Sequence, residues 1–446
     1  MSQDNEHNER NDLYPAHLKE WAARFEAALE SAGFDSVVIF AGAEQVVFRD
    51  DSTYPFVTEP YFKAWAPLTH HPDSAIRFTP GQRPRLVYFQ HTGFWHAPPD
   101  LPSGNWLEHF DLECVDNLAA RTSALGPLTG RVAAIGHPDD GLSEAVVWND
   151  AALLAALDFR RAYKTDYETA CMAEANVIAA RGHVAARQAY ENDASEFMIH
   201  QAYCESSAQR EIELPYLNIV ALNEHAAVLH YQKLTHTKPG TPSSFLIDAG
   251  ASCNGYASDV TRTYSRNAGS MQALIGSVDT MQQEICDRVE PGLDFVALNE
   301  TAHMLLASVL HAHGLILCTG EEAYERGITR TFLPHGLGHL LGLQVHDAGG
   351  HMAGPDGRRR EPPAEHPMLR LTRTLEPAFV VTIEPGLYFI PSLLETLRAS
   401  EYSALIDWRE VDALASFGGI RIEDDVLVTE DGSRNLSRPA LDRARV

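Results

Sequence analysis

The sequence lacks the features that would place the chain in a membrane or in an oxidising compartment. No uninterrupted apolar run is long enough to span a bilayer. The polar N-terminus contains no apolar segment typical of a secretory signal. The six cysteines are widely scattered and form no C-x-x-C pair, which favours reduced thiols over a disulfide framework. We therefore expect a soluble, cytoplasmic protein.

Basic residues are scarce relative to acidic ones. The chain has 35 Lys and Arg against 61 Asp and Glu, which leaves a formal net charge of −26. Nucleic acids and anionic membranes both bind clustered basic side chains, so this charge argues against either partner. The hydrophobic content of 45% and the charged content of 22% are those of an ordinary globular protein.

The length of 446 residues predicts two domains, because it exceeds what one simple core accommodates. The polar residues 1–12 are expected to form a disordered tail. Residues 13–160 alternate helical and strand-like segments, which predicts a small α/β N-terminal domain. Its strand-like runs lie at 36–40, 45–48, 85–89 and 131–136.

The second domain is expected over residues 161–446. Thr165 and Glu168 form a capping-box pattern that predicts the start of a long helix. A pair of helical segments followed by strands occurs twice in this half, which hints at an internal structural duplication. The fold class predicted for the whole chain is therefore mixed α/β.

Five residues of metal-binding type lie at or beside strand-like runs in the second half of the chain. Burying an unpaired carboxylate is costly, so carboxylates do not normally end such runs. Four carboxylates and one imidazole that converge would be neutralised by one or two hard divalent cations. The five residues are Asp248, Asp259, His339, Glu384 and Glu423.

The two aspartates are predicted to lie side by side across a hairpin. Residues 245–251 are apolar and strand-like, Asn254 and Gly255 form a turn signal, and Asp259 is expected to open the return strand. Two adjacent carboxylates repel each other unless a cation lies between them. Taken alone, such a pair would more often be two solvated aspartates at a hairpin end.

Three histidines alternate with glycines in the segment 334–347. Glycine lets the backbone turn tightly and approach a ligand closely. We predict His339 as the metal ligand and His346 as a group that acts on the substrate or supports a ligand. His335 is open between a supporting and a functional role.

The remaining ligands lie at strand ends. Glu384 precedes the turn Pro385-Gly386 and by itself could be a solvated carboxylate. Period-2 alternation puts Arg421 and Glu423 on one face of a strand, so Arg421 could orient a ligating carboxylate. The alternative for that pair is a surface ion pair.

These segments together closely resemble the pita-bread metallopeptidases, and within them the bacterial Xaa-Pro dipeptidases (prolidases). The resemblance covers nearly all of 160–446 and continues more weakly into residues 54–67. Five ligands in order and in context are more specific than a single motif. The matching segments are 218–231, 247–251, 258–263, 334–347, 382–388 and 418–428.

The resemblance implies a two-metal centre. Asp248 would hold one ion, Asp259 and Glu423 would bridge both, and His339 and Glu384 would complete the shell of the other. A hydroxide between the ions would attack the scissile carbonyl, and Glu384 would shuttle its proton. The hard ligand set favours Mn²⁺, with Co²⁺ possible.

The resemblance also implies the substrate contacts and the assembly. His346 would stabilise the tetrahedral intermediate, His230 and Arg370 would contact the substrate, and His335 is assigned to the same substrate-binding group. Alone, His230 would more often be a structural histidine and Arg370 a surface cation. The family's fold is a curved, pseudo-symmetric sheet with helices behind an α/β N-domain, and its assembly is a homodimer.

Other functions stay open at this stage. An aminopeptidase that acts on longer Xaa-Pro peptides is the nearest alternative, and a phosphotriester-hydrolysing side activity is a related expectation. A pita-bread binding module without catalysis is disfavoured, because all five predicted ligands are present. A metal-free amidino-hydrolase on the same fold would not need these carboxylates.

Overall fold

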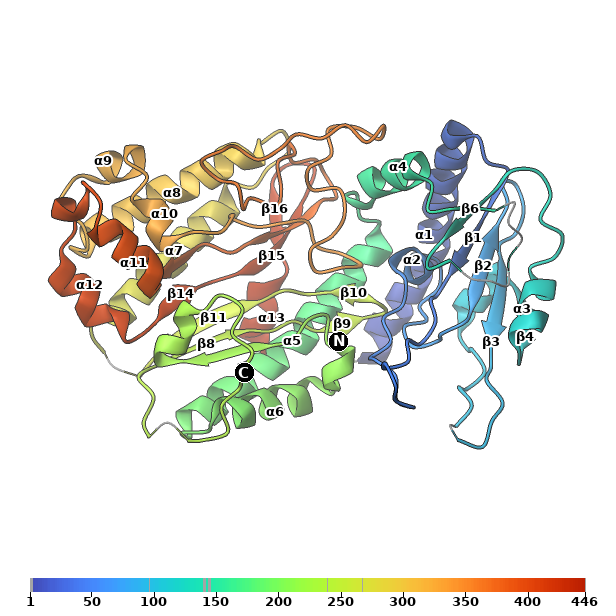
Figure 1. The fold of residues 1–446 in the computed structure, drawn as a ribbon, viewed down its shortest axis with the longest axis horizontal. Helices are drawn as coiled ribbons and strands as arrows, with labels where there is room; N and C mark the ends of the chain where they lie inside the picture. The colour runs from blue at the N-terminus through green and yellow to red at the C-terminus, as the bar shows by residue number, and fades with distance from the viewer. Residues whose placement is uncertain are drawn as a thin grey trace.

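The computed structural model describes residues 3–95, 97–138, 142, 146–238, 240–266 and 268–445, with side chains from residue 12 onward. The fold is mixed α/β, as predicted, with a smaller N-terminal part beside a larger C-terminal part (Figure 1). None of the helices in the described ranges combines the length and the apolarity that crossing a membrane would require.

The N-terminal part is built on one six-stranded sheet in the order β4-β3-β2-β1-β5-β6. The β1–β5 and β3–β4 pairs are parallel, whereas β1–β2 and β2–β3 are antiparallel. The strands are β1 (Ser36–Phe40), β2 (Ala75–Phe78), β3 (Arg85–Phe89), β4 (Asp111–Val115), β5 (Val132–Ile135) and β6 (Val147–Trp148). The helices are α1 (Gln3–Ala32), α2 (Pro60–Trp65), α3 (Leu118–Ala124) and α4 (Ala151–Arg161).

Two local predictions differ from this structure. The expected strand at 45–48 is wrong, because only Val46 pairs, with Thr53, in an isolated bridge. Phe48 is 87% exposed there, which shows that the apolar composition of a segment is not enough to make it a strand. Helix α1 begins at Gln3, where a disordered tail was predicted. Polar residues such as Gln and Glu are good helix formers and can extend a packed helix without burying anything.

The C-terminal part consists of several small antiparallel sheets that lie between helices (Figure 1). Their orders are β11-β8-β7, β12-β15-β16, β13-β14 and β10-β9. The strands are β7 (Ile219–Leu222), β8 (Ser244–Asp248), β9 (Ser252–Cys253), β10 (Tyr256–Ala257), β11 (Thr261–Ser265), β12 (Val380–Ile383), β13 (Gly386–Tyr388), β14 (Gly419–Arg421), β15 (Asp424–Val428) and β16 (Ser433–Asn435).

A helix pair followed by strands does occur twice in this part. The pair α5 and α6 precedes β7, β8 and β11, and the pair α7 and α8 precedes β12 and β15. The capping box predicted at Thr165 and Glu168 is formed at the start of α5. The helices are α5 (Asp166–Glu191), α6 (Glu196–Ser207), α7 (Ser270–Asp287), α8 (Phe295–Ala312), α9 (Gly320–Glu325), α10 (Thr329–Phe332), α11 (Pro391–Arg398), α12 (Trp408–Ala415) and α13 (Ser437–Ala444).

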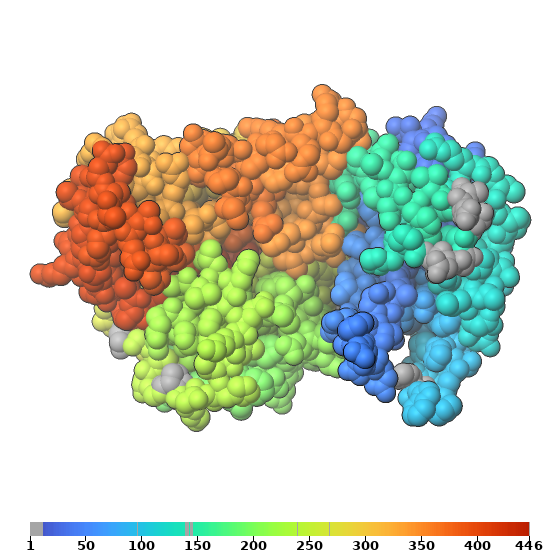
Figure 2. Space-filling view, viewed as in Figure 1, coloured from blue at the N-terminus to red at the C-terminus, as the bar shows by residue number. Residues whose placement is uncertain are grey.

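The two halves of the C-terminal part meet at strand ends. Thr261 at the start of β11 pairs with Asp248 at the end of β8, and an isolated bridge joins Thr261 to Glu423. Leu340 bridges Val381 of β12, which brings the glycine-rich segment alongside. Figure 2 shows a hollow between the yellow-green and the orange segments on this face of the molecule.

Candidate metal centre

A cavity of about 150 Å³ lies where these strand ends meet. It is formed from segments nearly 200 residues apart in the sequence, which β8, β12 and β14 bring together. All ten residues singled out in the sequence line it: His230, Asp248, Asp259, His335, His339, His346, Arg370, Glu384, Arg421 and Glu423.

Asp248 and Asp259 are adjacent, as the hairpin argument required. Tyr216 joins them, because its hydroxyl lies 2.7 Å from Oδ1 of Asp248 and 2.5 Å from Oδ1 of Asp259. The register is different from the prediction, however. Asp259 does not open the return strand, which begins at Thr261, since the turn at Asn254 belongs to the small β9–β10 hairpin inserted between the two aspartates.

His339 and Glu423 converge with Asp259 on one point. Ligand atoms of these three residues all lie within 4.8 Å of one another, and all three side chains are buried. Nε2 of His339 lies 3.5 Å from Oδ2 of Asp259 and 3.7 Å from Oε1 of Glu384. This approach depends on Gly338, where an added Cβ would lie 1.9 Å from the carbonyl oxygen of Thr382.

The electrostatics of the carboxylates are those of a site built for cations. Burial and the neighbouring carboxylates raise the pKa of Asp259 and hold the pKa of Glu423 well above its ordinary value. Burial raises the pKa of Glu384 to about 7, although His339 and Arg421 oppose the shift. Without cations these side chains would share protons to limit their repulsion. Divalent ions would replace those protons, so the residues fit a metal centre.

Arg421 supports the site from one side, as the alternation on its strand predicted. Its guanidinium lies 2.7 Å from Oδ2 of Asp248 and donates to the hydroxyl of Tyr388 at 3.0 Å. Tyr388 in turn lies 2.8 Å from Nε2 of His335, whose Nδ1 is 3.7 Å from Oε2 of Glu384. The surface ion-pair alternative for Arg421 is wrong, because its side chain is 5% exposed. His335 thus connects the side chains that support Asp248 to the side chain of Glu384.

The other three predicted residues form an exposed rim above the buried ligands. His230, His346 and Arg370 are all exposed and line the same cavity. The imidazole of His346 stands edge-on to that of His339, with ring centroids 4.4 Å apart. The cavity therefore has buried hydrogen-bond acceptors at its bottom and hydrogen-bond donors at its exposed rim.

Sequence reasoning missed two residues that hold the ligands. Tyr216, which bridges the aspartates, lies in a loop with no motif to signal it. Thr261 donates from Oγ1 to Oε2 of Glu423 at 2.6 Å and accepts from Nε of Arg421 at 3.2 Å. Thr261 could have been found, because alternation along the segment puts it on the same face as Asp259.

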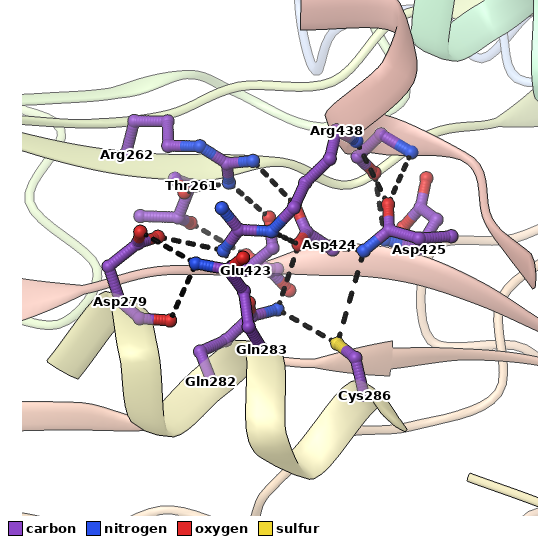
Figure 3. Close-up of polar contacts among 12 residues, drawn as sticks. Thr261, Arg262, Asp279, Gln282, Gln283, Cys286, Glu423, Asp424, Asp425 and Arg438 are labelled. Carbon is purple, nitrogen blue, oxygen red and sulfur yellow. Dashed lines mark hydrogen bonds and ion pairs between the residues drawn. The ribbon is translucent and has the colours of Figure 1, made fainter. Parts of the chain in front are cut away.

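A buried ionic network backs the site on the opposite face of β15 (Figure 3). Asp424 follows Glu423, so its side chain points the other way. It pairs with Arg262 at 2.5 Å and with Arg438 at 2.7 Å, and it accepts from Gln282 at 3.0 Å. Burial opposes its ionisation, but the two arginines hold the pKa of Asp424 below its ordinary value. This network holds the start of β15, directly after Glu423.

Comparisons with known proteins agree with this geometry. Residues 12–159 match the model of the Xaa-Pro dipeptidase N-terminal domain, and residues 170–430 match metallopeptidase family M24. The chain is 48% identical over 429 residues to an Xaa-Pro dipeptidase of Stenotrophomonas maltophilia, covering 96% of this chain and 97% of that protein. An Xaa-Pro dipeptidase of Xanthomonas campestris is also 48% identical, over 428 residues and with the same coverage.

Solved structures with the same fold include those of aminopeptidases. Pseudomonas aeruginosa aminopeptidase PepP matches with a TM-score of 0.70 at 22% identity, over 96% of this chain and 98% of that one. Escherichia coli aminopeptidase P matches with a TM-score of 0.69, also at 22% identity, over 96% and 99%. These matches show the pita-bread fold. The two domain models and the nearly full-length relatives show that the chain is a hydrolase that belongs to metallopeptidase family M24, among the Xaa-Pro dipeptidases.

Proposed function

We propose that this protein hydrolyses Xaa-Pro dipeptides with the help of two divalent ions. The observation that carries the proposal is the buried convergence of carboxylates and an imidazole beneath an exposed rim of histidines and one arginine. The 48% identical relatives are Xaa-Pro dipeptidases over nearly their whole length, which supports the same substrate class here.

The residues that would hold the ions are the five predicted ligands. Their chemistry, four carboxylates and one imidazole, suits hard ions such as Mn²⁺ or Co²⁺ better than zinc. Bound ions of this kind polarise a carbonyl and make water a nucleophile near neutral pH. Four negative charges against two dications would leave the site nearly neutral. The ligands are Asp248, Asp259, His339, Glu384 and Glu423.

The chain's own residues would do the rest of the chemistry. Glu384 would accept a proton from the attacking water and pass it to the leaving imino nitrogen. His346 would donate to the oxygen of the tetrahedral intermediate. His230 and Arg370 at the rim would hold the substrate, with the guanidinium of Arg370 paired to the proline carboxylate.

Recognition of proline needs such a carboxylate contact. The imino-acid amide has no N–H to donate, so a site cannot read it by that hydrogen bond. Specificity for proline must therefore come from the shape of its ring and from the charge of its free carboxylate. A cation at the rim therefore favours dipeptides over longer peptides, in which that carboxylate lies further along the chain.

The test is hydrolysis of Ala-Pro by metal-stripped protein that is reloaded with Mn²⁺, Co²⁺ or Zn²⁺. We expect turnover that needs about two ions per chain and is lost with a chelator. A length series of Ala-Pro, Ala-Pro-Ala and Ala-Pro-Ala-Ala separates the two peptidase activities. Efficient cleavage of the longer peptides would replace the dipeptidase proposal with an aminopeptidase.

We further propose residues 13–160 as the N-terminal domain and 161–446 as the catalytic domain, in a homodimer. The domain models that match 12–159 and 170–430 support the boundary near residue 160. Analytical ultracentrifugation tests the dimer, and a sedimentation coefficient of a monomer would reject it.

A further inference from the structure

His346 lies at an exposed position, yet its proposed role needs a fixed position. The residue is exposed, and in the described part of the chain its imidazole makes no hydrogen bond. Its ring contact with His339 is the only ring contact found for it there. Its placement must therefore come from the backbone of the loop 342–347 that carries it.

Three cations from the first 164 residues hold that loop on both sides of His346. Before it, Nζ of Lys63 in α2 donates to the carbonyl oxygen of Leu343 at 3.0 Å. The same ammonium donates to the carbonyl oxygen of Gly255 at 3.3 Å, which ties the loop to the β9–β10 hairpin. Lys63 thus anchors the loop three residues ahead of the imidazole.

Directly after His346, Asp347 is clamped by two cations. Its Oδ1 contacts Arg161 at the end of α4, and its Oδ2 lies 3.0 Å from Nζ of Lys164. The side chain of Asp347 is 1% exposed, that of Arg161 4% and that of Lys164 1%. Arg161 also donates to Oε1 of Gln344 at 3.1 Å. Burial opposes the ionisation of Asp347, but the two cations hold its pKa below the ordinary value.

The backbone of the loop packs closely against this clamp. The backbone N–H of Asp347 donates to the carbonyl oxygen of Leu340 at 2.9 Å, which closes the loop on itself. A Cβ added to Gly342 would lie 2.5 Å from Oδ2 of Asp347 and 2.8 Å from Cε of Lys164. A buried carboxylate that loses its charge here would leave two buried cations without their partner, and the loop would shift to relieve them.

We propose that Asp347, clamped by Arg161 and Lys164, is a positioning residue that sets the place of His346 over the scissile bond. The inference rests on the proposed function, because it assigns the clamp to the same reaction. It also makes the segment that links the N-terminal part to α5 a component of the active site. Asp347 itself touches no substrate. It acts through His346.

A double-mutant cycle tests the proposal. We expect His346→Ala to lower kcat for Ala-Pro by about 100-fold, in the range found for the loss of one oxyanion donor. Asp347→Asn should lower kcat by about 10-fold or more. Because Asp347 acts only through His346, the double variant should be no slower than His346→Ala alone, within about 2-fold. Losses that multiply in the double variant would overturn the proposal.

Two further variants keep the test informative if Asp347→Asn does not fold. Lys164→Gln removes one cation of the clamp, and Lys63→Met removes the anchor on the other side. Each should lower kcat more than it raises KM, and each loss should also vanish in the His346→Ala background. An effect that persists there would contradict the inference. The control is Asp73→Asn, which breaks the pair with Arg121 at 3.6 Å within the N-terminal part and should keep kcat unchanged.

The wild-type protein distinguishes this inference from the proposed function. Hydrolysis of Ala-Pro by the Mn²⁺-loaded wild type reports on the function, whereas the cycle reports on the clamp. Metal content measured on the Asp347, Lys164 and Lys63 variants should stay at the wild-type value, because none of these three side chains contacts a predicted ligand. A loss of bound Mn²⁺ in Asp347→Asn would assign the clamp to the metal centre and overturn its role through His346.

Discussion

The strongest physical prediction is that the metal-free protein loses stability as the pH rises, and that Glu384 carries much of the loss. Burial raises the pKa of this carboxyl from 4.5 to about 7 in the fold. A carboxyl with a raised pKa binds more protons folded than unfolded between these two values. Linkage then lowers the free energy of unfolding as the pH rises through that window, from about 4.5 to about 7.

The magnitude follows from the size of the shift. At about 1.4 kcal/mol for each pH unit, a shift from 4.5 to about 7 corresponds to about 3.5 kcal/mol, of which about 3 kcal/mol is lost above pH 5. The side chain is 18% exposed, so solvent screens little of this cost. A chain of 446 residues has an unfolding entropy of about 0.9 kcal/mol per kelvin, which converts the loss into about 3 °C in Tm.

The assay compares chelator-treated wild type with Glu384→Gln by thermal unfolding at pH 5 and pH 8. Between these values the Tm of the wild type should fall by about 3 °C relative to the variant. Mn²⁺ should restore the wild type more at pH 8 than at pH 5, since protons compete with the ion for the carboxylates. Glu365→Gln, at an exposed position, is the control and should show no such trend. A Tm difference between wild type and Glu384→Gln that is equal at both pH values would refute the reasoning.

The remaining predictions concern single contacts. Tyr216→Phe removes the hydroxyl that joins the two aspartates and should weaken Mn²⁺ binding by about 10–100-fold in calorimetric titrations, with the fold kept. Arg421→Met leaves Asp248 without its cation and should weaken Mn²⁺ binding to a similar degree; unchanged affinity would contradict the supporting role. Asp259→Asn should abolish turnover while circular dichroism stays unchanged, and near-normal activity would reject its bridging role. Arg370→Met should raise KM for Ala-Pro by about 10-fold or more while affecting Ala-Pro-amide far less.

Much of the site was predictable because its residues depart from a local rule, namely that apolar, strand-like runs rarely end in a charged side chain. Carboxylates at the ends of apolar runs, such as Asp248 after Phe-Leu-Ile, signal a buried charge that needs a partner. Alternation along 420–423 placed Arg421 beside Glu423 without knowledge of the fold. These signals depend on one strand and its immediate neighbours, so they are visible in the sequence.

Other features were not predictable because they depend on pairing at long range. The apolar run at 45–48 has the composition of a strand, but in the fold it makes only the isolated bridge between Val46 and Thr53. The register of Asp259 was misplaced by two residues, because the small β9–β10 hairpin is inserted between the aspartates. Local propensity describes what a segment can do, and the sheet around it decides what it does.

The sequence by itself determined the chemistry of this protein. Four carboxylates and one imidazole in their particular contexts predict a metal site, because residue type and local period are properties of the chain alone. Only the tertiary structure decided what holds that chemistry in place. Lys63 reaches Leu343 across 280 residues, and Tyr216 joins two aspartates from a loop without a motif. Such contacts follow from how the elements pack, and packing at that range leaves no periodic trace in the sequence.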